Sequence, residues 1–336
     1  MILSMTASLQ LRPVLADDLE AVTAYADIVN AVRAADVPWE HRTTVAERVG
    51  VLRWGWDLAP YQVFLVHDGE RDVAVGQYAV SVWDNFHLAW VDVLVHPDHR
   101  RRGIGTYLYD ALAAHARAEG RTSIGTSSWD APGPRAFAAA QGLELKTQEI
   151  LRRQHLAELD RAELDRLWED ALPHASAYEL VRLMDPLPEE DLDAMAVMTA
   201  AINDAPMGSL DIEDEVFDAR RLRAVEEAHR LRNLRVYRVN ARHRETGAWV
   251  GESVVAVDGE QPQIASQYAT SVVRAHRGHR LGLLLKLDML LWLAQAEPGL
   301  ETIDTMNAEV NAHMIGVNEL LGYRVLDREL AFQRDL

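Results

Sequence analysis

A loop rich in arginine and glycine, HRRRGIGT, begins at His99 and follows an apolar segment. The residues after it have helical periodicity, so the loop is predicted to form a helix N-terminus, where unpaired N–H groups and the positive end of the helix dipole suit a phosphate. Gly103 and Gly105 lack Cβ atoms and let an anion approach the backbone closely. The three arginines before them add positive charge in a chain of net charge −18. This pattern predicts a phosphate-binding loop.

A related loop occurs 177 residues further on. VRAHRGHRLGLLL, from Val273, aligns with HPDHRRRGIGTYL, from His96. The same offset pairs Asp130 with Asn307, each just after a short strand-like run. The segments LRPVLADDLEAV and VRLMDPLPEEDLDAM match before the loops, and QGLEL and LGYRV match after them. Four matches in one order indicate an internal duplication.

The second loop departs from the first at Arg280, which stands where the first loop has Gly103. We expect a Cβ to be tolerated here on the condition that the backbone is helical, and the guanidinium would then bind phosphate itself. Loss of ligand binding in this half of the chain is the alternative.

Neither loop has the pattern of a nucleotide-binding protein. No Gly-Lys-Ser/Thr follows, as it does in a P-loop, and the Gly-x-Gly-x-x-Gly spacing of dinucleotide-binding folds is missing. The run from Arg100 to Gly105 resembles instead the acyl-CoA signature of the GNAT superfamily, Arg/Gln-x-x-Gly-x-Gly/Ala. The resemblance in pattern covers nearly the whole chain. Two such domains in one chain are typical of mycothiol synthase-like enzymes, although no motif here selects their substrate.

The resemblance implies acetyl-CoA (coenzyme A) as the cofactor, with its pyrophosphate in the loops and its pantetheine arm along the preceding strands. In the first half the implied contacts are Val93, Leu94, Val95, Arg100, Arg101, Arg102, Gly103, Ile104, Gly105, Thr106 and Asp130. In the second half they are Val272, Val273, Arg277, Gly278, His279, Arg280, Leu281, Gly282, Leu283, Asn307 and Asn311. Asn307 and Asn311 have the spacing of one helical turn and would face the same way, while helix capping by Asn307 is the alternative.

Amide formation from an acyl thioester needs a base for the ammonium, a donor for the oxyanion and an acid for the thiolate. The resemblance implies a carboxylate base on a central strand, for which Asp92 is the candidate in the first half, with a structural strand residue as the alternative. Ala269 takes that position in the second half, so Glu252 and then Tyr268 become candidates there. The family's tyrosine acid is replaced by Ala138 and Asn318. Neither is an acid, but Asn318 is expected to hydrogen-bond the sulfur or a water.

The elements needed to position these residues are visible as periodicity. In the first half we predict strands at 9–12, 61–67, 73–83, 88–95, 122–129 and 143–151, and helices up to residue 35, at 104–119 (ended by Gly120) and at 134–141. A strand, a helix and another strand at the centre imply a parallel crossover. The fold class is therefore α/β, with two GNAT-type domains that each have a mixed, mostly antiparallel sheet flanked by helices. We place them at 1–158 and 177–336, joined by a linker helix at 159–176.

Composition limits the remaining possibilities. The chain has no cysteine, which excludes disulfides and thiolate chemistry, and its acidity argues against nucleic-acid or membrane partners. The N-terminus, MILSMTASLQLRP, lacks the pattern of a signal peptide, so a cytoplasmic protein, monomer or homodimer, is expected. We expect no metal site, although His96, His99, His276 and His279 lie near the loops. The predicted function is an N-acetyltransferase acting on a primary amine of a small molecule; an acyl-CoA-binding module with one or both domains inactive is the alternative.

Overall fold

The computed structural model describes residues 9–336, which form two compact units. The first unit contains the described residues up to Thr147 together with Ser209–Glu213 and Glu329–Leu336. The second contains Gln148–Gly208 and Asp214–Arg328. Residues 1–8, on which part of the signal-peptide argument depends, lie outside the described residues. No helix among residues 9–336 is long and apolar enough to cross a membrane.

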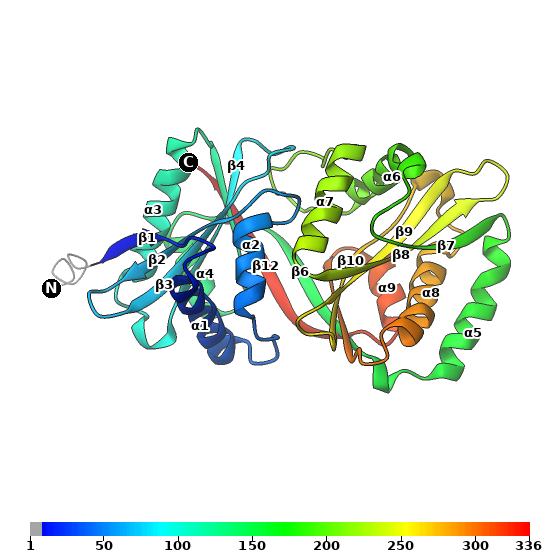
Figure 1. Cartoon of the computed structure of the whole chain (residues 1–336), viewed down its shortest axis with the longest axis horizontal. Coiled ribbons are helices and arrows are strands. Elements are labelled where there is room, and N and C mark those ends of the chain that lie inside the picture. Colours follow the sequence, from blue (N-terminus) through cyan, green and yellow to red (C-terminus); the bar gives the residue numbers. More distant parts are fainter. Residues whose placement is uncertain (1–8) are drawn as a thin grey trace. The chain divides into compact units, whose positions relative to one another are not determined.

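The first unit is built on a mixed sheet (Figure 1). Its strand order is β1-β2-β3-β4-β5-β12, and β4 and β5 are the parallel pair. The strands are β1 (Gln10–Pro13), β2 (Gln62–His67), β3 (Asp72–Ala79), β4 (Leu88–Val95), β5 (Ser123–Trp129) and the end of β12 (Arg324–Asp335). The central strand β4 has the bounds that its continuous apolar run predicted.

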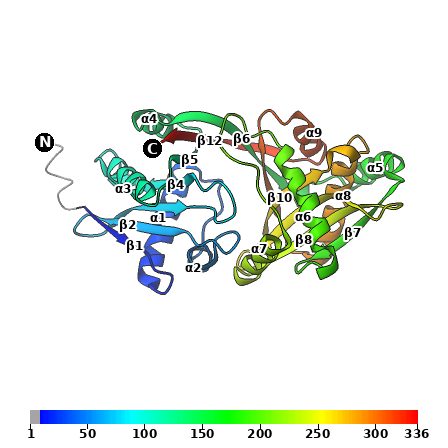
Figure 2. The same ribbon diagram turned by 90° about the horizontal axis from the view of Figure 1, so that it is seen from above.

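Helices cover both faces of this sheet. Helices α1 (Leu19–Asp36) and α2 (Val45–Trp54) pack on one face, over Val63, Leu65 and Val75. Helices α3 (Ile104–Ala118) and α4 (Pro132–Ala140) pack on the other, over Val66, Val91 and Ile124 (Figure 2). Capping explains where these helices begin and end: Asp18 and Thr44 accept N–H groups at the starts of α1 and α2, and Gly120, with φ of 79°, follows α3.

The second unit repeats the arrangement. Its order is β6-β11-β10-β9-β8-β7, and β10 and β11 are the parallel pair. Its strands are β6 (Glu144–His155), β7 (Tyr178–Met184), β8 (Leu234–His243), β9 (Trp249–Asp258), β10 (Ile264–Val272) and β11 (Thr302–Ala308). Helices α5 (Arg161–Ala171), α8 (Leu281–Ala296) and α9 (Ala312–Leu320) share one core, and α6 (Leu192–Thr199) and α7 (Ala219–Leu231) form another with Trp249. The predicted fold class is confirmed.

The compact units differ from the sequence halves in their final strands. Residues 149–155 of β6, at the end of the first half, pair with β11, and residues 329–335 of β12 pair with β5. The two strands occupy equivalent places in the repeat and offer the same pattern of backbone donors and acceptors, so exchanging them loses no hydrogen bond. The linker helix appears as α5 and packs on α8 in the second unit. The limits of the duplicated halves stay a prediction.

Candidate functional site

The parallel strands of the first unit separate halfway along β4. Pairing runs from Leu88–Ser123 to Trp90–Gly125, and no pair joins residues 91–95 to β5 in the described part of the chain. A Cβ on Gly125 would come within 2.4 Å of the Trp90 ring, so only glycine lets the indole cross β5 at this point. The opening exposes the edge of β4 that contains Val93, Leu94 and Val95. A linear ligand can pair with backbone groups there.

The first loop forms an anion-binding backbone. Arg101 and Gly103 have positive φ angles of 61° and 80°, with one residue between them, and α3 begins at Ile104. Within residues 9–336 no acceptor is found for the N–H groups of residues 103–106. Left-handed residues alternating with other conformations, followed by a helix N-terminus, direct several N–H groups to one concavity. The loop therefore has a backbone conformation that suits an anion, and phosphate binding there stays a prediction.

Two of the three arginines of this loop, Arg100 and Arg102, bind the protein itself. Arg100 donates from Nε to the Val95 carbonyl oxygen at 3.1 Å and makes two bonds of 2.7 Å to the Asp36 carboxylate. Arg102 lies 2.9 Å from Nδ1 of His99. Arg100 thus ties the loop to the end of β4 and to α1. Contact of these side chains with phosphate stays a prediction, and the available donors are the backbone N–H groups and the exposed side chain of Arg101.

The second loop has the same backbone with a different residue at each left-handed position. Gly278 has φ of 86° and Arg280 φ of 55°, and α8 begins at Leu281. Our condition that the backbone be helical at Arg280 is wrong: the residue adopts the left-handed conformation that Gly103 adopts in the first loop. Arg277 donates to the Val272 carbonyl oxygen at 2.9 Å and to Asp204 at 2.6 Å, as Arg100 does to Val95 and Asp36.

Two side chains of the second loop are turned toward the end of α5. Arg280 Nη1 donates to the Asp170 carbonyl oxygen at 3.2 Å, and His279 Nδ1 lies 3.2 Å from the His174 carbonyl oxygen. The arginine therefore satisfies a carbonyl at a helix C-terminus, where a cation is also favoured by the dipole. Its expected role as a phosphate ligand has this competing partner.

Several predicted cofactor contacts are available only through their backbone. The side chains of Ile104, Leu281 and Leu283 are buried in the cores under α3 and α8. Thr106 is exposed and accepts a hydrogen bond from Gln141. A Cβ added at Gly105 would lie at least 3.4 Å from any neighbouring atom, and one added at Gly282 at least 4.0 Å. The valines pack on neighbouring cores: Val93 and Val95 under α3, Val272 under α8 and Val273 near α6.

Asp92 ends a buried chain of hydrogen bonds in the first unit. Its Oδ2 accepts from Gln77 Nε2 at 3.0 Å, and Gln77 Oε1 accepts from the Tyr25 hydroxyl at 2.6 Å. The Tyr25 oxygen accepts in turn from Arg48 Nη1 at 3.0 Å, and Arg48 pairs with Glu47. Burial raises the pKa of Asp92 to about 6, although the charge of Arg48 acts against that rise. A carboxyl with this pKa is largely ionised at neutral pH and still a competent base.

Aromatic and acidic side chains lie at the end of β5. Trp39 and Trp129 form an edge-to-face pair with ring centroids 4.8 Å apart. Glu40 pairs with Arg33 at 2.8 Å and accepts a hydrogen bond from Trp129, and burial raises its pKa. Trp39 therefore lies beside Trp129, at the end of β5 where the parallel pair has separated. Indole faces and carboxylates favour a cation.

The two positions of the missing tyrosine are buried. Ala138 lies on α4 and packs in the core that α3 covers. Asn318 on α9 is fully buried, and its amide contacts two protein groups: Oδ1 accepts from Lys286 Nζ at 2.8 Å and Nδ2 donates to Asn307 Oδ1 at 2.6 Å. Direct contact of Asn318 with a sulfur, as we expected, would require these bonds to break.

Asn307 and Asn311 do not lie one helical turn apart, contrary to our prediction. Asn307 belongs to strand β11, and Asn311 is the N-cap of α9, accepting from Met314 N at 3.3 Å. A chain reversal at residues 309–310 separates them, so the four-residue spacing does not place them on one helical face. Capping by Asn307 is wrong for the same reason. The matching Asp130 in the first unit pairs with Arg135 at 2.5 Å and 2.9 Å.

The catalytic candidates of the second unit contact other protein groups. Glu252 is buried and accepts from Arg238 at 3.4 Å, and Arg238 also pairs with Asp185 at 2.9 Å. Burial raises the pKa of Glu252 against the effect of Arg238. Tyr268 is stacked on His229, with ring centroids 5.6 Å apart, at a register shift in β10. Glu252 is thus buried on β9, and Tyr268 is half-buried on β10, one residue before Ala269, the position that matches Asp92.

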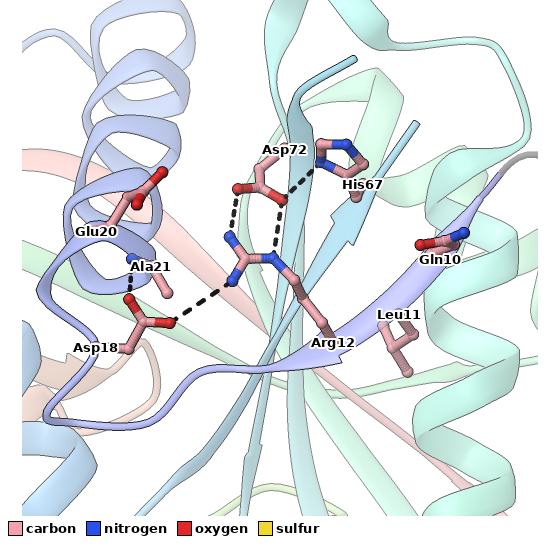
Figure 3. Close-up of a pocket in the computed structure, with 8 residues that line it drawn as sticks. All are labelled: Gln10, Leu11, Arg12, Asp18, Glu20, Ala21, His67 and Asp72. Carbon is pink, nitrogen blue, oxygen red and sulfur yellow. Dashed lines mark hydrogen bonds and ion pairs between the residues drawn. The ribbon is translucent and has the colours of Figure 1, made fainter. Parts of the chain in front are cut away.

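A surface pocket of about 390 Å³ lies elsewhere, between β1 and α1 (Figure 3). Its guanidinium, Arg12, pairs with Asp72 at 2.7 Å and with Asp18 at 3.9 Å, and Asp18 caps α1. These ion pairs connect β1 to the N-terminus of α1 and to the start of β3. No predicted site residue lines this pocket. Among residues 9–336 no group of three or more histidine, cysteine or carboxylate side chains could hold a metal ion.

Sequence reasoning missed Tyr25, Arg48 and Gln77. They come from α1, α2 and β3, and only the folded chain brings them together. One signal was available: β3 and β4 are neighbours, so an alignment of their antiparallel register places Gln77 opposite Asp92.

Comparison with known proteins relates the chain to several acetyltransferases. Residues 27–141 match the model of the Acetyltransferase (GNAT) family. A mycothiol acetyltransferase from Amycolatopsis mediterranei (strain U-32) is 28% identical over 315 residues, which are 90% of this chain and 92% of that protein. The structure of a tandem GNAT protein from the clavulanic acid biosynthesis pathway, without AcCoA, superposes with a TM-score of 0.81 at 30% identity, covering 97% of this chain and 98% of that one. A GCN5-related N-acetyltransferase from Sphaerobacter thermophilus shares the fold, with a TM-score of 0.67 at 15% identity and coverage of 98% and 96%.

Proposed function

Because the chain belongs to the GNAT family and is an N-acetyltransferase with two such domains in tandem, we propose that it acetylates a primary amine of a small molecule with acetyl-CoA as donor, and that the first unit performs the transfer. The observation that carries the proposal is Asp92. It lies two residues beyond the last β4–β5 pair, and it is half-buried with a pKa of about 6.

The residues present fit acetyl-CoA. The unpaired N–H groups of residues 103–106 and the left-handed residues Arg101 and Gly103 form a concavity for a pyrophosphate. A Cβ at Gly103 would meet no protein atom within 4 Å, so the space over the loop is open to a ligand. The free edge of β4 suits the amides of a pantetheine arm. When bound, acetyl-CoA supplies an acetyl group activated as a thioester.

Asp92 would take the proton that the substrate ammonium must lose. The chain from Arg48 through Tyr25 to Gln77 directs an N–H donor at Asp92 Oδ2, which leaves the other carboxylate oxygen for the substrate or a bridging water. A positioned base of this kind contributes roughly 10²–10⁴-fold to the rate. The protein offers no tyrosine at the family position, so the leaving thiolate would be protonated by water.

The amine would be recognised at the end of β5. Trp39, Trp129 and Glu40 offer two indoles and a carboxylate, a combination that favours a cationic group over a neutral one. The net charge of −18 acts in the same direction at long range. These features support an amine substrate.

In the second unit we propose binding of acetyl-CoA without transfer. Its loop has the backbone angles of the first, and β10 and β11 pair only as far as Gln267–Thr305. Ala269 stands where Asp92 stands in the first unit, and Glu252 is held by Arg238. The N–H groups suit a pyrophosphate, but the position that matches Asp92 has no carboxylate.

Steady-state assays of acetyl-CoA consumption across a panel of primary amines test this function. The wild type should acetylate at least one amine, and Asp92→Asn should lose about 10²-fold or more of kcat while acetyl-CoA binding, measured by calorimetry, is unchanged. An Asp92→Asn enzyme with wild-type kcat would exclude Asp92 as the base. A wild type that binds acetyl-CoA but consumes none with any amine would favour the alternative, an acyl-CoA-binding module.

A further inference from the structure

Lys286 is a buried cation in the second unit that the transfer reaction does not use. It lies on α8, is 2% exposed, and enters no ion pair among the described residues. Its Nζ donates to Asn318 Oδ1 at 2.8 Å and lies 4.5 Å from the centroid of the Tyr323 ring. Burial lowers the pKa of Lys286 to about 7. An uncompensated buried ammonium is costly, so its single acceptor requires an explanation.

The protonated form of Lys286 fixes the orientation of two amides. An ammonium has only donors, so below about pH 7 the atom of Asn318 that faces Lys286 must be the oxygen. The Asn318 nitrogen then faces Asn307, and it donates to Asn307 Oδ1 at 2.6 Å. The Asn307 nitrogen is consequently turned away from α9. In the part of the chain that the structure describes, no protein acceptor is found for it.

Asn307 lies where the second unit is open. The parallel pairing of β10 and β11 ends at Gln267–Thr305, and Asn307 is two residues further along β11. The residue is half-buried, in contrast to Asn318 and Lys286. The chain of hydrogen bonds from Lys286 through Asn318 thus ends at the opening in the N–H₂ group of Asn307. The matching residue of the first unit is Asp130, whose carboxylate is paired with Arg135.

We propose that Lys286 is a positioning residue: through Asn318 it holds the Asn307 amide with its N–H₂ toward the opening, as a donor to a carbonyl oxygen of bound acetyl-CoA. The inference rests on the proposed binding of acetyl-CoA by the second unit. It explains why a lysine is buried under α9 with an amide as its acceptor, because a carboxylate in place of the Asn318 amide would neutralise the lysine but reverse the polarity of Asn307.

That reversal supplies the test. Asn318→Asp conserves volume and gives Lys286 an ionic partner, so we expect the melting temperature to be equal or higher. Both oxygens of the new side chain accept, so Asn307 must turn its N–H₂ toward the introduced carboxylate and present Oδ1 to the opening. A purely structural role for the chain predicts no loss of binding from this variant. Lys286→Met removes the cation and keeps a side chain of similar length. The Asn318 and Asn307 amides are then free to adopt either orientation and are not forced into the reversed one.

Calorimetry with acetyl-CoA should be performed in a Gly105→Asp background, in which only the second unit is expected to bind. Asn318→Asp should weaken this site at least about tenfold with an unchanged or raised melting temperature, and Lys286→Met should weaken it less. Equal affinity in the Asn318→Asp protein would overturn the positioning role and leave the proposed function intact. If the Gly105→Asp parent binds no acetyl-CoA at all, the second unit has no such site, and both the binding proposal and the role of Lys286 fail.

Discussion

Gly103 and Arg280 adopt the same left-handed conformation, with φ of 80° and 55°, each immediately before the helix that follows its loop. The left-handed position two residues earlier has the opposite assignment, Arg101 in the first loop and Gly278 in the second. Each loop therefore has one glycine and one arginine at its two left-handed positions. The duplicated loops have the same backbone geometry but a different place for the glycine, which is why Arg280 is a departure from the signature in sequence.

This relationship predicts unequal costs for two alanine substitutions in the first loop. Gly103→Ala should lower the free energy of unfolding by about 1 kcal/mol, because a Cβ there meets no atom within 4 Å and only the left-handed backbone is disfavoured. Gly105→Ala, inside α3, should be neutral or slightly stabilising because alanine favours a helix. Chemical denaturation of both variants checks the difference. Equal stabilities would contradict the assigned conformation of Gly103.

Gly105→Asp should abolish binding of acetyl-CoA by the first unit. A carboxylate at the start of α3 would compete with a pyrophosphate for the N–H groups of residues 103–106 and would repel it. The same negative charge interacts favourably with the N-terminal end of the helix dipole, so the fold should persist. Calorimetry should report one site in place of two, and Gly105→Ala serves as the control for the added Cβ. Unchanged stoichiometry and affinity would show that the loop does not hold the cofactor.

Much of the fold was predictable from the sequence because its signals are local. The continuous apolar run of β4, the glycine after α3 and the repeat itself each occupy a few consecutive residues. The exchange of β6 and β12 was not predictable, because the two strands offer equivalent hydrogen bonds and the sequence contains no preference between them. Helix α2 was also missed, since its apolar residues do not gather on one face.

The candidate site was predictable only where one segment contains it. Both loops and Asp92 follow from motifs a few residues long, whereas the partners that adjust Asp92 lie 15, 44 and 67 positions away in sequence, at Gln77, Arg48 and Tyr25. For Asn307 and Asn311 a local pattern gave a wrong prediction. Their four-residue spacing suggested one helical turn, but the chain reverses direction between the end of β11 and the start of α9. Contacts between distant residues depend on tertiary packing.

Arg48 should set the pH at which Asp92 becomes active. Its charge lowers the pKa of Asp92, so Arg48→Gln should raise that pKa and move the acidic limb of the kcat/KM profile to higher pH, by up to about one unit. Arg48→Lys keeps the charge and should leave the limb near pH 6. The profiles must be recorded below the melting temperature of each variant, because Arg48→Gln removes the ion pair with Glu47. A limb that does not move in Arg48→Gln would exclude electrostatic coupling between the two residues.

Asp92 should also make the protein less stable at neutral pH than it would be without the charge. The pKa of its carboxyl is about 6 in the folded chain and 3.8 ordinarily, so between these values the folded state retains a proton that the unfolded state has released. Stability from this group is therefore fully present below about pH 4 and is lost as the pH rises through 6. Asparagine cannot ionise and keeps the shape of the side chain. At pH 8 the free energy of unfolding of Asp92→Asn should therefore exceed that of the wild type by on the order of 2 kcal/mol, after allowance for partial exposure, and at pH 4 the two should be about equal.

Denaturant titrations of both proteins at the two pH values measure this difference. Asp36→Asn, which alters an exposed ion pair with Arg100, controls for a general effect of removing an aspartate. If the variant is no more stable than the wild type at pH 8, burial does not raise the pKa of the Asp92 carboxyl, and this argument for Asp92 as the base fails.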